Sequence, residues 1–168
     1  MSYKINRDDA DALLGQQKTI IEKHSDRLDF TRAKAAHAFK VDDIADRAEN
    51  TDLFFFNFFR LRIACRTRFD ISSVTYGDIT IRSNVGSGVA TELDKINAGY
   101  GDYMLYCWGS RETIKEYVIL DLEEFRARQN DFLKNHAIPN KDNYTRFNSY
   151  DLNKIIRTPC CVVAHLVA

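Results

Sequence analysis

Arginines occupy four of the five alternating positions between residues 60 and 68 in the stretch RLRIACRTR. Side chains alternate between the two faces of a β-strand, so an extended conformation places these arginines on one face, interrupted only by Ala64. Same-side residues of a strand lie about 6.6 Å apart, which is comparable with the spacing of phosphates along one nucleic-acid strand. The candidate nucleic-acid-binding residues are therefore Arg60, Arg62, Arg66 and Arg68, with Arg82 from a later predicted strand.

This basic face has two other interpretations. A guanidinium can pair bidentately with a carboxylate, and the chain contains 24 Asp and Glu residues. The face could instead contact a protein partner. Phosphate binding, an ion-paired sheet surface and a protein interface all stay open on the residues alone.

Composition restricts the class of protein. The 168 residues include 24 Lys and Arg and 24 Asp and Glu, so the formal net charge is zero and any anion site must be local. We expect one domain over residues 1–168, which is long enough to bury a core. The sequence contains no apolar signal core and no stretch of about 20 apolar residues, so we expect a soluble, cytoplasmic protein with no membrane partner.

Cysteines and histidines give no sign of a metal site. The four cysteines lack the CxxC spacing typical of zinc sites, and they lie in apolar contexts, so we expect free thiols in a reducing compartment. The four histidines are scattered along the chain, and none has ligand spacing to a cysteine. We therefore expect ordinary surface or core histidines.

The first fifty residues predict a helical N-terminal region. Apolar side chains recur at helical spacing in a stretch that lacks proline. These positions are Ile20, Ile21, His24, Leu28, Ala35, Ala36 and Phe39. Residues 52–59 and 60–68 follow, and their aromatic and β-branched composition predicts two strands paired as a hairpin.

The remaining chain predicts alternating strands and helices. The expected elements are a strand over 78–83, a short helix over 90–98 capped by Thr91, strands over 102–108 and 116–122, a helix over 123–134 and a strand over 160–167. Residues 51–126 would form the core, and residues 127–168 a C-terminal helix and strand. The fold class expected is α/β, with a mixed central sheet of about five or six strands flanked by helices.

The run of five phenylalanines at positions 54–59 is interrupted only by Asn57. Such a run is typical of a strand buried on both faces. The alternative is a homodimer interface that shields an unusually apolar strand.

Several short patterns in this order resemble the PD-(D/E)XK nuclease superfamily, which has the restriction-endonuclease-like fold. They are Thr51-Asp52-Leu53 at the opening of a strand, Arg66-Thr67-Arg68 at the end of the next, the strand Thr80 to Arg82, and the segment TELDKI…GYGDYMLYCW. The resemblance covers about residues 45–126. The chain resembles small uncharacterised proteins, many of phage type, that look like divergent members of the superfamily.

The resemblance implies a site that this sequence does not reproduce. In that superfamily an acid near the start of one strand and an acid-x-lysine pair on the next bind divalent metal for phosphodiester hydrolysis. Asp52 matches the first position. Arg66 and Arg68 occupy the second, and a guanidinium cannot ligate a cation.

A relocated catalytic set is the remaining route to an enzyme. Its candidates are Asp52, Asp78, Glu92 and Lys95, of which Glu92 and Lys95 share a face of a short helix. A chain that used this set would be a metal-dependent endonuclease or exonuclease with Mg²⁺ as its cofactor. Without the set, no cofactor is expected.

The sequence therefore predicts a divergent, catalytically degenerate nuclease-fold protein that binds nucleic acid through its basic strand face. The alternatives are a protein-interaction module, such as a phage-type modulator of a host protein or an oligomeric factor, and an active nuclease with the relocated set. Fold alone does not choose between them.

Overall fold

The computed structural model describes residues 7–28, 39–40, 53–56, 60–69, 72–110, 112–140 and 144–167. The described helices are α1 (Arg7–Lys23), the 3-10 helix η1 (Ser25–Arg27), α3 (Ser73–Tyr76), α4 (Glu92–Asn97), α5 (Leu122–Phe132) and α6 (Leu152–Ile155). The described strands are β1 (Phe39–Lys40), β2 (Leu53–Phe56), β3 (Arg60–Phe69), β4 (Asp78–Val85), β5 (Tyr103–Gly109), β6 (Ile114–Asp121), β7 (Leu133–Pro139), β8 (Thr145–Asp151) and β9 (Cys161–His165). The chain is a mixed α/β protein with two sheets.

The larger sheet has the strand order β1-β2-β3-β5-β6-β9. Strands β3 and β5 run parallel, and the other neighbouring strands are antiparallel. The predicted hairpin over residues 52–68 is confirmed, because Leu53 pairs with Ile63 and Phe56 with Arg60. Every residue of β5 is buried, which agrees with a central strand that is apolar on both faces. The burial of the phenylalanine run lies outside the described side chains.

The smaller sheet has the order β4-β8-β7, and all its pairs are antiparallel. The prediction of a mixed sheet of about five or six strands is confirmed for the larger sheet, but it is wrong for the strand expected over 78–83, which lies in the second sheet. Strands β7 and β8 are absent from the prediction. Strand β7 (LKNHAIP) lies at the solvent-exposed edge of its sheet and its apolar residues do not alternate, while β8 (TRFNSYD) lies between β4 and β7 but is largely polar.

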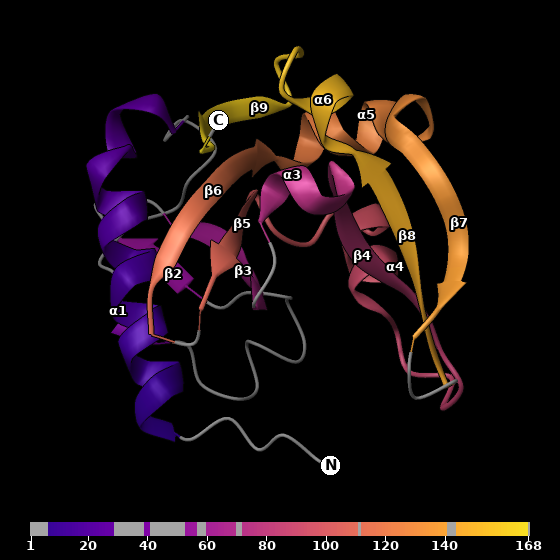
Figure 1. Cartoon of the computed structure of the whole chain (residues 1–168), viewed down its shortest axis with the longest axis horizontal. Coiled ribbons are helices and arrows are strands. Elements are labelled where there is room, and N and C mark those ends of the chain that lie inside the picture. The colour runs from indigo at the N-terminus through magenta and orange to yellow at the C-terminus, as the bar shows by residue number, and fades with distance from the viewer. Residues whose placement is uncertain are drawn as a thin grey trace.

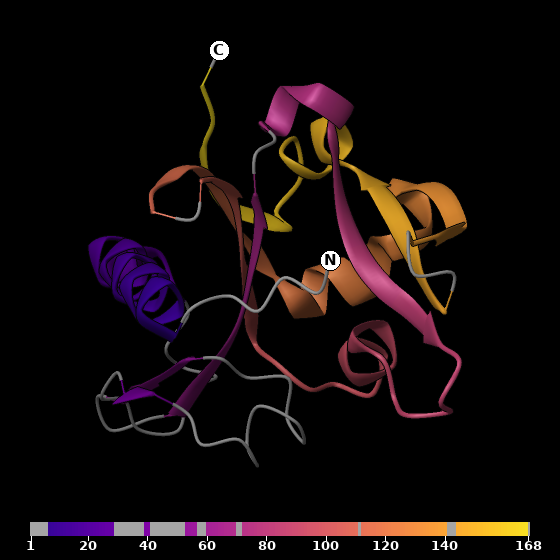
Figure 2. The same ribbon diagram turned by 60° about the horizontal axis from the view of Figure 1, so that its bottom comes forward.

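The two faces of the larger sheet are covered by different elements (Figures 1 and 2). Helix α1 covers one face, where Ile21 packs in a core with Leu61 and Ile63. The smaller sheet, α4 and α5 cover the other face, where Ile79 and Tyr106 belong to a second core. The arginine positions of β3 point toward this second layer, since they share a face with Ala64.

The predicted helical region is partly confirmed. Helix α1 contains Ile20 and Ile21 as expected. Phe39, however, begins the two-residue strand β1 and pairs with Phe54 of β2, so its assignment to a helix is wrong. Residues 29–38 and 41–52, including Asp52, lie outside the described part of the chain.

Helix α4 begins with the predicted cap. The Thr91 hydroxyl accepts a hydrogen bond from the Asp94 backbone N–H, and the Asp94 carboxylate accepts one from the Thr91 N–H. This reciprocal pair satisfies two N–H groups that the helix leaves unpaired, and it lowers the pKa of Asp94. The cap fixes the first turn of α4, which carries Glu92.

Candidate functional site

Three described arginines of β3, here called the arginine row, are Arg62, Arg66 and Arg68. Each forms an ion pair with one carboxylate. Arg62 pairs with Asp102, whose carboxylate lies 3.0 Å from Nη2 and also accepts the Arg62 backbone N–H at 2.7 Å. Asp102 directly precedes β5, the parallel neighbour of β3, so the pairing of the two strands brings it to Arg62. The side chain of Arg60 lies outside the described part of the structure.

Arg66 pairs with Glu92 at the start of α4. The distance from Arg66 Nη1 to Glu92 Oε2 is 2.6 Å, and the same oxygen accepts the Arg82 backbone N–H at 3.3 Å. One carboxylate therefore connects β3 of the larger sheet, β4 of the smaller sheet and α4. The Arg82 side chain is exposed beside this connection.

Arg68 pairs with Asp78 at the start of β4. Arg68 Nη1 lies 2.8 Å from Asp78 Oδ1, and Asp78 is buried. The chain thus places a second carboxylate between the two sheets. The two pairs together join β3 to the smaller sheet at both Asp78 and Arg82.

The acids and the arginines that the sequence assigned to alternative sites are partners of each other. Asp78 and Glu92, from the relocated catalytic set, hold Arg68 and Arg66. Lys95 lies in the last turn of α4. Within the described residues, no three His, Cys, Asp or Glu side chains are grouped so that they could hold a metal ion. The two described carboxylates of the proposed metal site, Asp78 and Glu92, are thus both held in ion pairs with arginines.

Two aromatic rings flank the arginine row. The guanidinium carbon of Arg66 lies 5.6 Å from the centroid of the Phe147 ring on β8, and that of Arg68 lies 5.3 Å from the Tyr76 ring on α3. These distances fit cation–π contacts. Sequence reasoning missed both rings, because Phe147 and Tyr76 come from elements that were not predicted.

The outer edge of β4 is closed by side chains. The Thr80 backbone N–H donates to the Tyr106 hydroxyl at 3.1 Å, and the Arg82 N–H donates to Glu92. Unpaired N–H groups at a sheet edge are available to other strands. Tyr106 and Glu92 therefore protect this edge as well as filling the space between the sheets.

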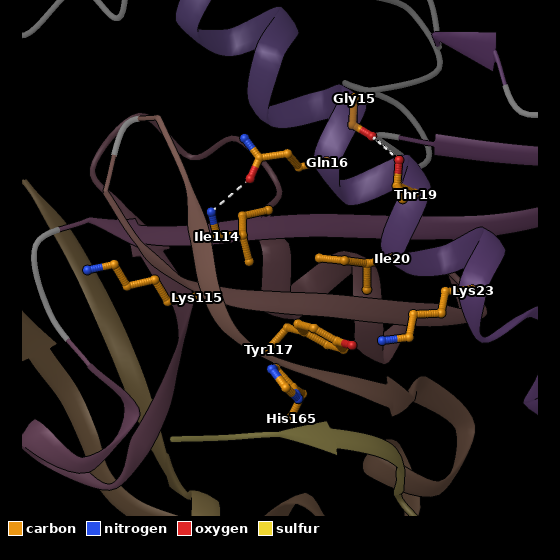
Figure 3. A pocket seen from close by; sticks show the side chains of 9 residues that line it. All are labelled: Gly15, Gln16, Thr19, Ile20, Lys23, Ile114, Lys115, Tyr117 and His165. Atoms are coloured by element: carbon orange, nitrogen blue, oxygen red, sulfur yellow. Dashed lines mark hydrogen bonds between the residues drawn. The ribbon is translucent and has the colours of Figure 1, made fainter. Parts of the chain in front are cut away.

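A second candidate site lies between α1 and the edge of the larger sheet formed by β6 and β9. It is a pocket of about 630 Å³, and its lining includes Gln16, Ile20, Lys23, Lys115, Tyr117 and His165 (Figure 3). The residues from α1 recur at helical spacing on one face, which is adjacent to the buried stripe of that helix. The sequence pattern gave no sign of this pocket, because its walls are about 90 residues apart in the chain.

Tyr117 forms the centre of the pocket wall. Its hydroxyl lies 2.9 Å from His24 Nε2, and its ring stacks on His165 with centroids 5.1 Å apart. Burial, followed by the positive charges of Lys23 and Arg27, lowers the pKa of His24. Burial and the neighbouring positive charges therefore both favour the neutral form of His24.

The cysteines are free, as predicted. Burial raises the pKa of Cys107 and Cys160 to about 12 and that of Cys161 to about 11. Thiols with such pKa values are poor nucleophiles at neutral pH. They belong to the packing of the two cores.

The sequence matches none of the protein-family models and none of the curated proteins with which it was compared. Among the described helices, none has the length and apolar character of a membrane span.

Proposed function

We propose that this chain binds single-stranded nucleic acid without cleaving it, along the surface that carries Arg66, Arg68 and Arg82. The observation that carries the proposal is the contact of two guanidinium groups with aromatic rings at this surface, Arg66 with Phe147 and Arg68 with Tyr76. Proteins that bind single strands without sequence preference combine backbone-contacting cations with aromatic side chains on which bases stack. Tyr76 is 54% exposed beside Arg68, so its ring is accessible to a base.

The ion pairs are compatible with binding but reduce its strength. A guanidinium has five N–H donors, so one carboxylate leaves donors of Arg66 and Arg68 for a phosphate. The carboxylates also hold the two guanidinium groups in place, which lowers the entropy lost on binding. They neutralise charge, however, so we expect three phosphate contacts and a slope of log K against log salt of about −2 for a single strand.

The absence of cleavage in this proposal rests on Asp78 and Glu92. A catalytic metal would need carboxylate oxygens that are turned toward it, whereas these oxygens are bound to Arg68 and Arg66. Two guanidinium groups beside the carboxylates would also repel a divalent cation. Breaking both pairs would leave buried charges without partners.

The relation to the PD-(D/E)XK superfamily is part of the same proposal. The element order gives it partial support. The helix, three strands, helix and strand that the resemblance implies correspond to α1, β2, β3, β4, α4 and β5, but β1 precedes β2 and helix α3 lies between β3 and β4. The position of β4 in a separate sheet is a difference from the single sheet expected of this fold class. A divergent binding protein built on this element order is the form that we propose.

The proposal can be tested with variants that leave the ion pairs intact. Arg82→Ala and Tyr76→Ala remove exposed side chains, and Arg157→Ala removes an exposed arginine after α6 as a matched control. Fluorescence anisotropy with labelled single-stranded DNA, single-stranded RNA and duplex DNA would be measured between about 50 and 200 mM salt. We expect Arg82→Ala to weaken single-strand binding and to reduce the salt slope by about 0.7, while Tyr76→Ala weakens binding with the slope unchanged.

Two outcomes would contradict the proposal. This surface would be excluded as the binding site if single-stranded nucleic acid bound with equal affinity to the wild type, Arg82→Ala, Tyr76→Ala and the Arg157→Ala control. Cleavage of any substrate with Mg²⁺ or Mn²⁺, lost in Asp78→Asn, would instead favour the active nuclease with relocated acids.

A further inference from the structure

The pocket between α1, β6 and β9 is cationic. Its described lining contains Lys23, Lys115 and His165 and no carboxylate. Neither Lys23 nor Lys115 forms an ion pair with any residue that the structure describes, in contrast to the arginine row. In Figure 3 the two lysines lie on opposite sides of Tyr117, one at the end of α1 and the other on β6. The Lys23 ammonium extends toward Tyr117, whereas that of Lys115 points away from it (Figure 3), so an anion beside Tyr117 meets Lys23 first, and a ligand that contacts both lysines needs the Lys115 side chain to turn inward.

The walls of the pocket are held in place. Gln16 of α1 accepts a hydrogen bond from the Ile114 N–H at 2.9 Å and donates one to the Glu112 carbonyl at 2.7 Å, which ties the helix to β6 and the turn before it. Tyr117 is fixed by His24 on one side and by the ring of His165 on the other. A preformed pocket loses little conformational entropy when a ligand binds.

We infer that this pocket binds a phosphorylated nucleoside whose planar ring lies against the His165 and Tyr117 side of the pocket and whose phosphates contact Lys23 and Lys115. The volume of about 630 Å³ falls within the range of small-molecule sites. The His165 ring is exposed and is backed by Tyr117, so it offers a flat surface of the kind on which bases stack. Ile20 and Ile114 add apolar contact surface on the helix side and the strand side.

The type and placement of the cationic side chains indicate which class of anion the pocket binds. An ammonium group acts as a compact point charge, which suits phosphate, whereas a carboxylate is matched better by the planar fork of arginine. Two lysines on opposite sides of an aromatic wall suit a ligand with two separated anionic groups. A nucleoside that carries both 3′ and 5′ phosphates has this arrangement, either as a free molecule or as one nucleotide of a strand.

The site is separate from the surface proposed above for nucleic acid. The arginine row faces the smaller sheet, whereas the pocket lies on the α1 side of the larger sheet. Variants in the pocket and variants at Arg82 and Tyr76 therefore test the two binding proposals independently.

Calorimetric titration of the full chain tests the inference. The probes are adenosine 3′,5′-bisphosphate, adenosine 5′-monophosphate, adenosine and isophthalate, which is a ring with two carboxylates. We expect affinity to fall in that order for the three nucleosides, by about tenfold for each phosphate removed, and we expect isophthalate to bind more weakly than the bisphosphate. A trinucleotide that binds at least as tightly as the bisphosphate identifies a strand as the ligand, and weaker binding identifies a free nucleotide.

Variants connect the affinity to the pocket. Lys23→Ala and Lys115→Ala should each reduce affinity for the bisphosphate by about tenfold without changing affinity for adenosine. Lys18→Ala is the matched control, because Lys18 lies on the same helix in a surface pair with Glu22 and outside the pocket. Gly15→Leu should block binding, since a side chain at this pocket-lining position finds open space to fill. Absence of nucleotide binding, equal binding of isophthalate, or equal effects of Lys18→Ala and Lys23→Ala would overturn the inference.

Discussion

Arg66 Nη1 on β3 lies 2.6 Å from Glu92 Oε2 on α4, so a candidate phosphate-binding residue and a candidate metal-binding residue are joined to each other. Both side chains are largely buried, with exposed fractions of 23% and 13%. The pair also holds the edge of β4 through the Arg82 N–H. Its first role is therefore to connect the two sheets.

Removal of either partner should destabilise the fold. We expect Glu92→Gln and Arg66→Met each to lower the free energy of unfolding by about 2 kcal/mol, because a charged hydrogen bond is lost and the remaining charge is left without its partner. A double-mutant cycle measured by urea unfolding should give a coupling energy of about 1.5 kcal/mol. The exposed pair Arg128 and Glu124 on α5 is the control, with an expected coupling of about 0.4 kcal/mol. Equal coupling in the two cycles would contradict a connecting role for the buried pair.

The Tyr106 hydroxyl should protect the edge of β4. Tyr106→Phe removes the acceptor of the Thr80 N–H, and we expect a loss of about 1 kcal/mol of stability together with faster hydrogen exchange at Thr80. The exchange would be followed by NMR. Tyr100→Phe, which removes a hydroxyl from a partly exposed ring, should leave the exchange of Thr80 unchanged. An unaltered Thr80 rate in Tyr106→Phe would mean that this hydrogen bond does not protect the edge.

Glu116 should make stability depend on pH. Burial alone would raise the pKa of Glu116, but hydrogen bonds from Ser73 and Val167 and the charge of His165 together lower it below the ordinary value of 4.5. A group whose pKa is lowered by folding stabilises the protein above its unfolded pKa. This contribution is therefore complete above about pH 4.5 and is lost as the pH falls below it. Urea unfolding of the wild type and Glu116→Gln should converge as the pH falls from 5 to about 3, and parallel curves would contradict the assignment.

Alanine substitutions at two glycines should change the free energy of unfolding in opposite directions. Gly15 lies inside α1, and a Cβ there meets no other atom within 4 Å, so Gly15→Ala should raise the free energy of unfolding by about 0.8 kcal/mol. At Gly109 a Cβ would overlap the backbone oxygen of Thr113, so Gly109→Ala should lower it by about 3 kcal/mol. Thermal unfolding of both variants checks the sign of each effect. A stable Gly109→Ala protein would mean that the turn after β5 can move.

Much of the local structure could be predicted from the sequence. The alternation in residues 60–68 identifies β3, the apolar residues on both faces of 103–109 identify a central strand, and Thr91 identifies the start of α4. Each of these signals is contained in a few neighbouring residues. Strand β7 gave no such signal because a strand at a solvent-exposed edge needs few apolar residues, and β8, which lies between β4 and β7, carries mostly polar residues without apolar alternation.

The partners of the arginines could not be predicted in the same way. Asp102 reaches Arg62 through the parallel pairing of β3 and β5, and Asp78 reaches Arg68 only because β4 belongs to the second sheet. These relationships depend on how distant segments pack. A carboxylate immediately before a buried strand, as in Asp102-Tyr103, was the one available signal.

The strands of the two sheets are interspersed along the chain, and this affects the order in which the protein folds. The hairpins β5–β6 and β7–β8 join neighbouring segments, so they can form early. The pairing of Asp78 with Asp151 instead closes a loop of about 70 residues, and its entropic cost must be met before β4 gains its neighbour. We therefore expect the β4–β8 ladder to be a late step, preceded by an intermediate in which the edge of β8 is open to pairing with another chain.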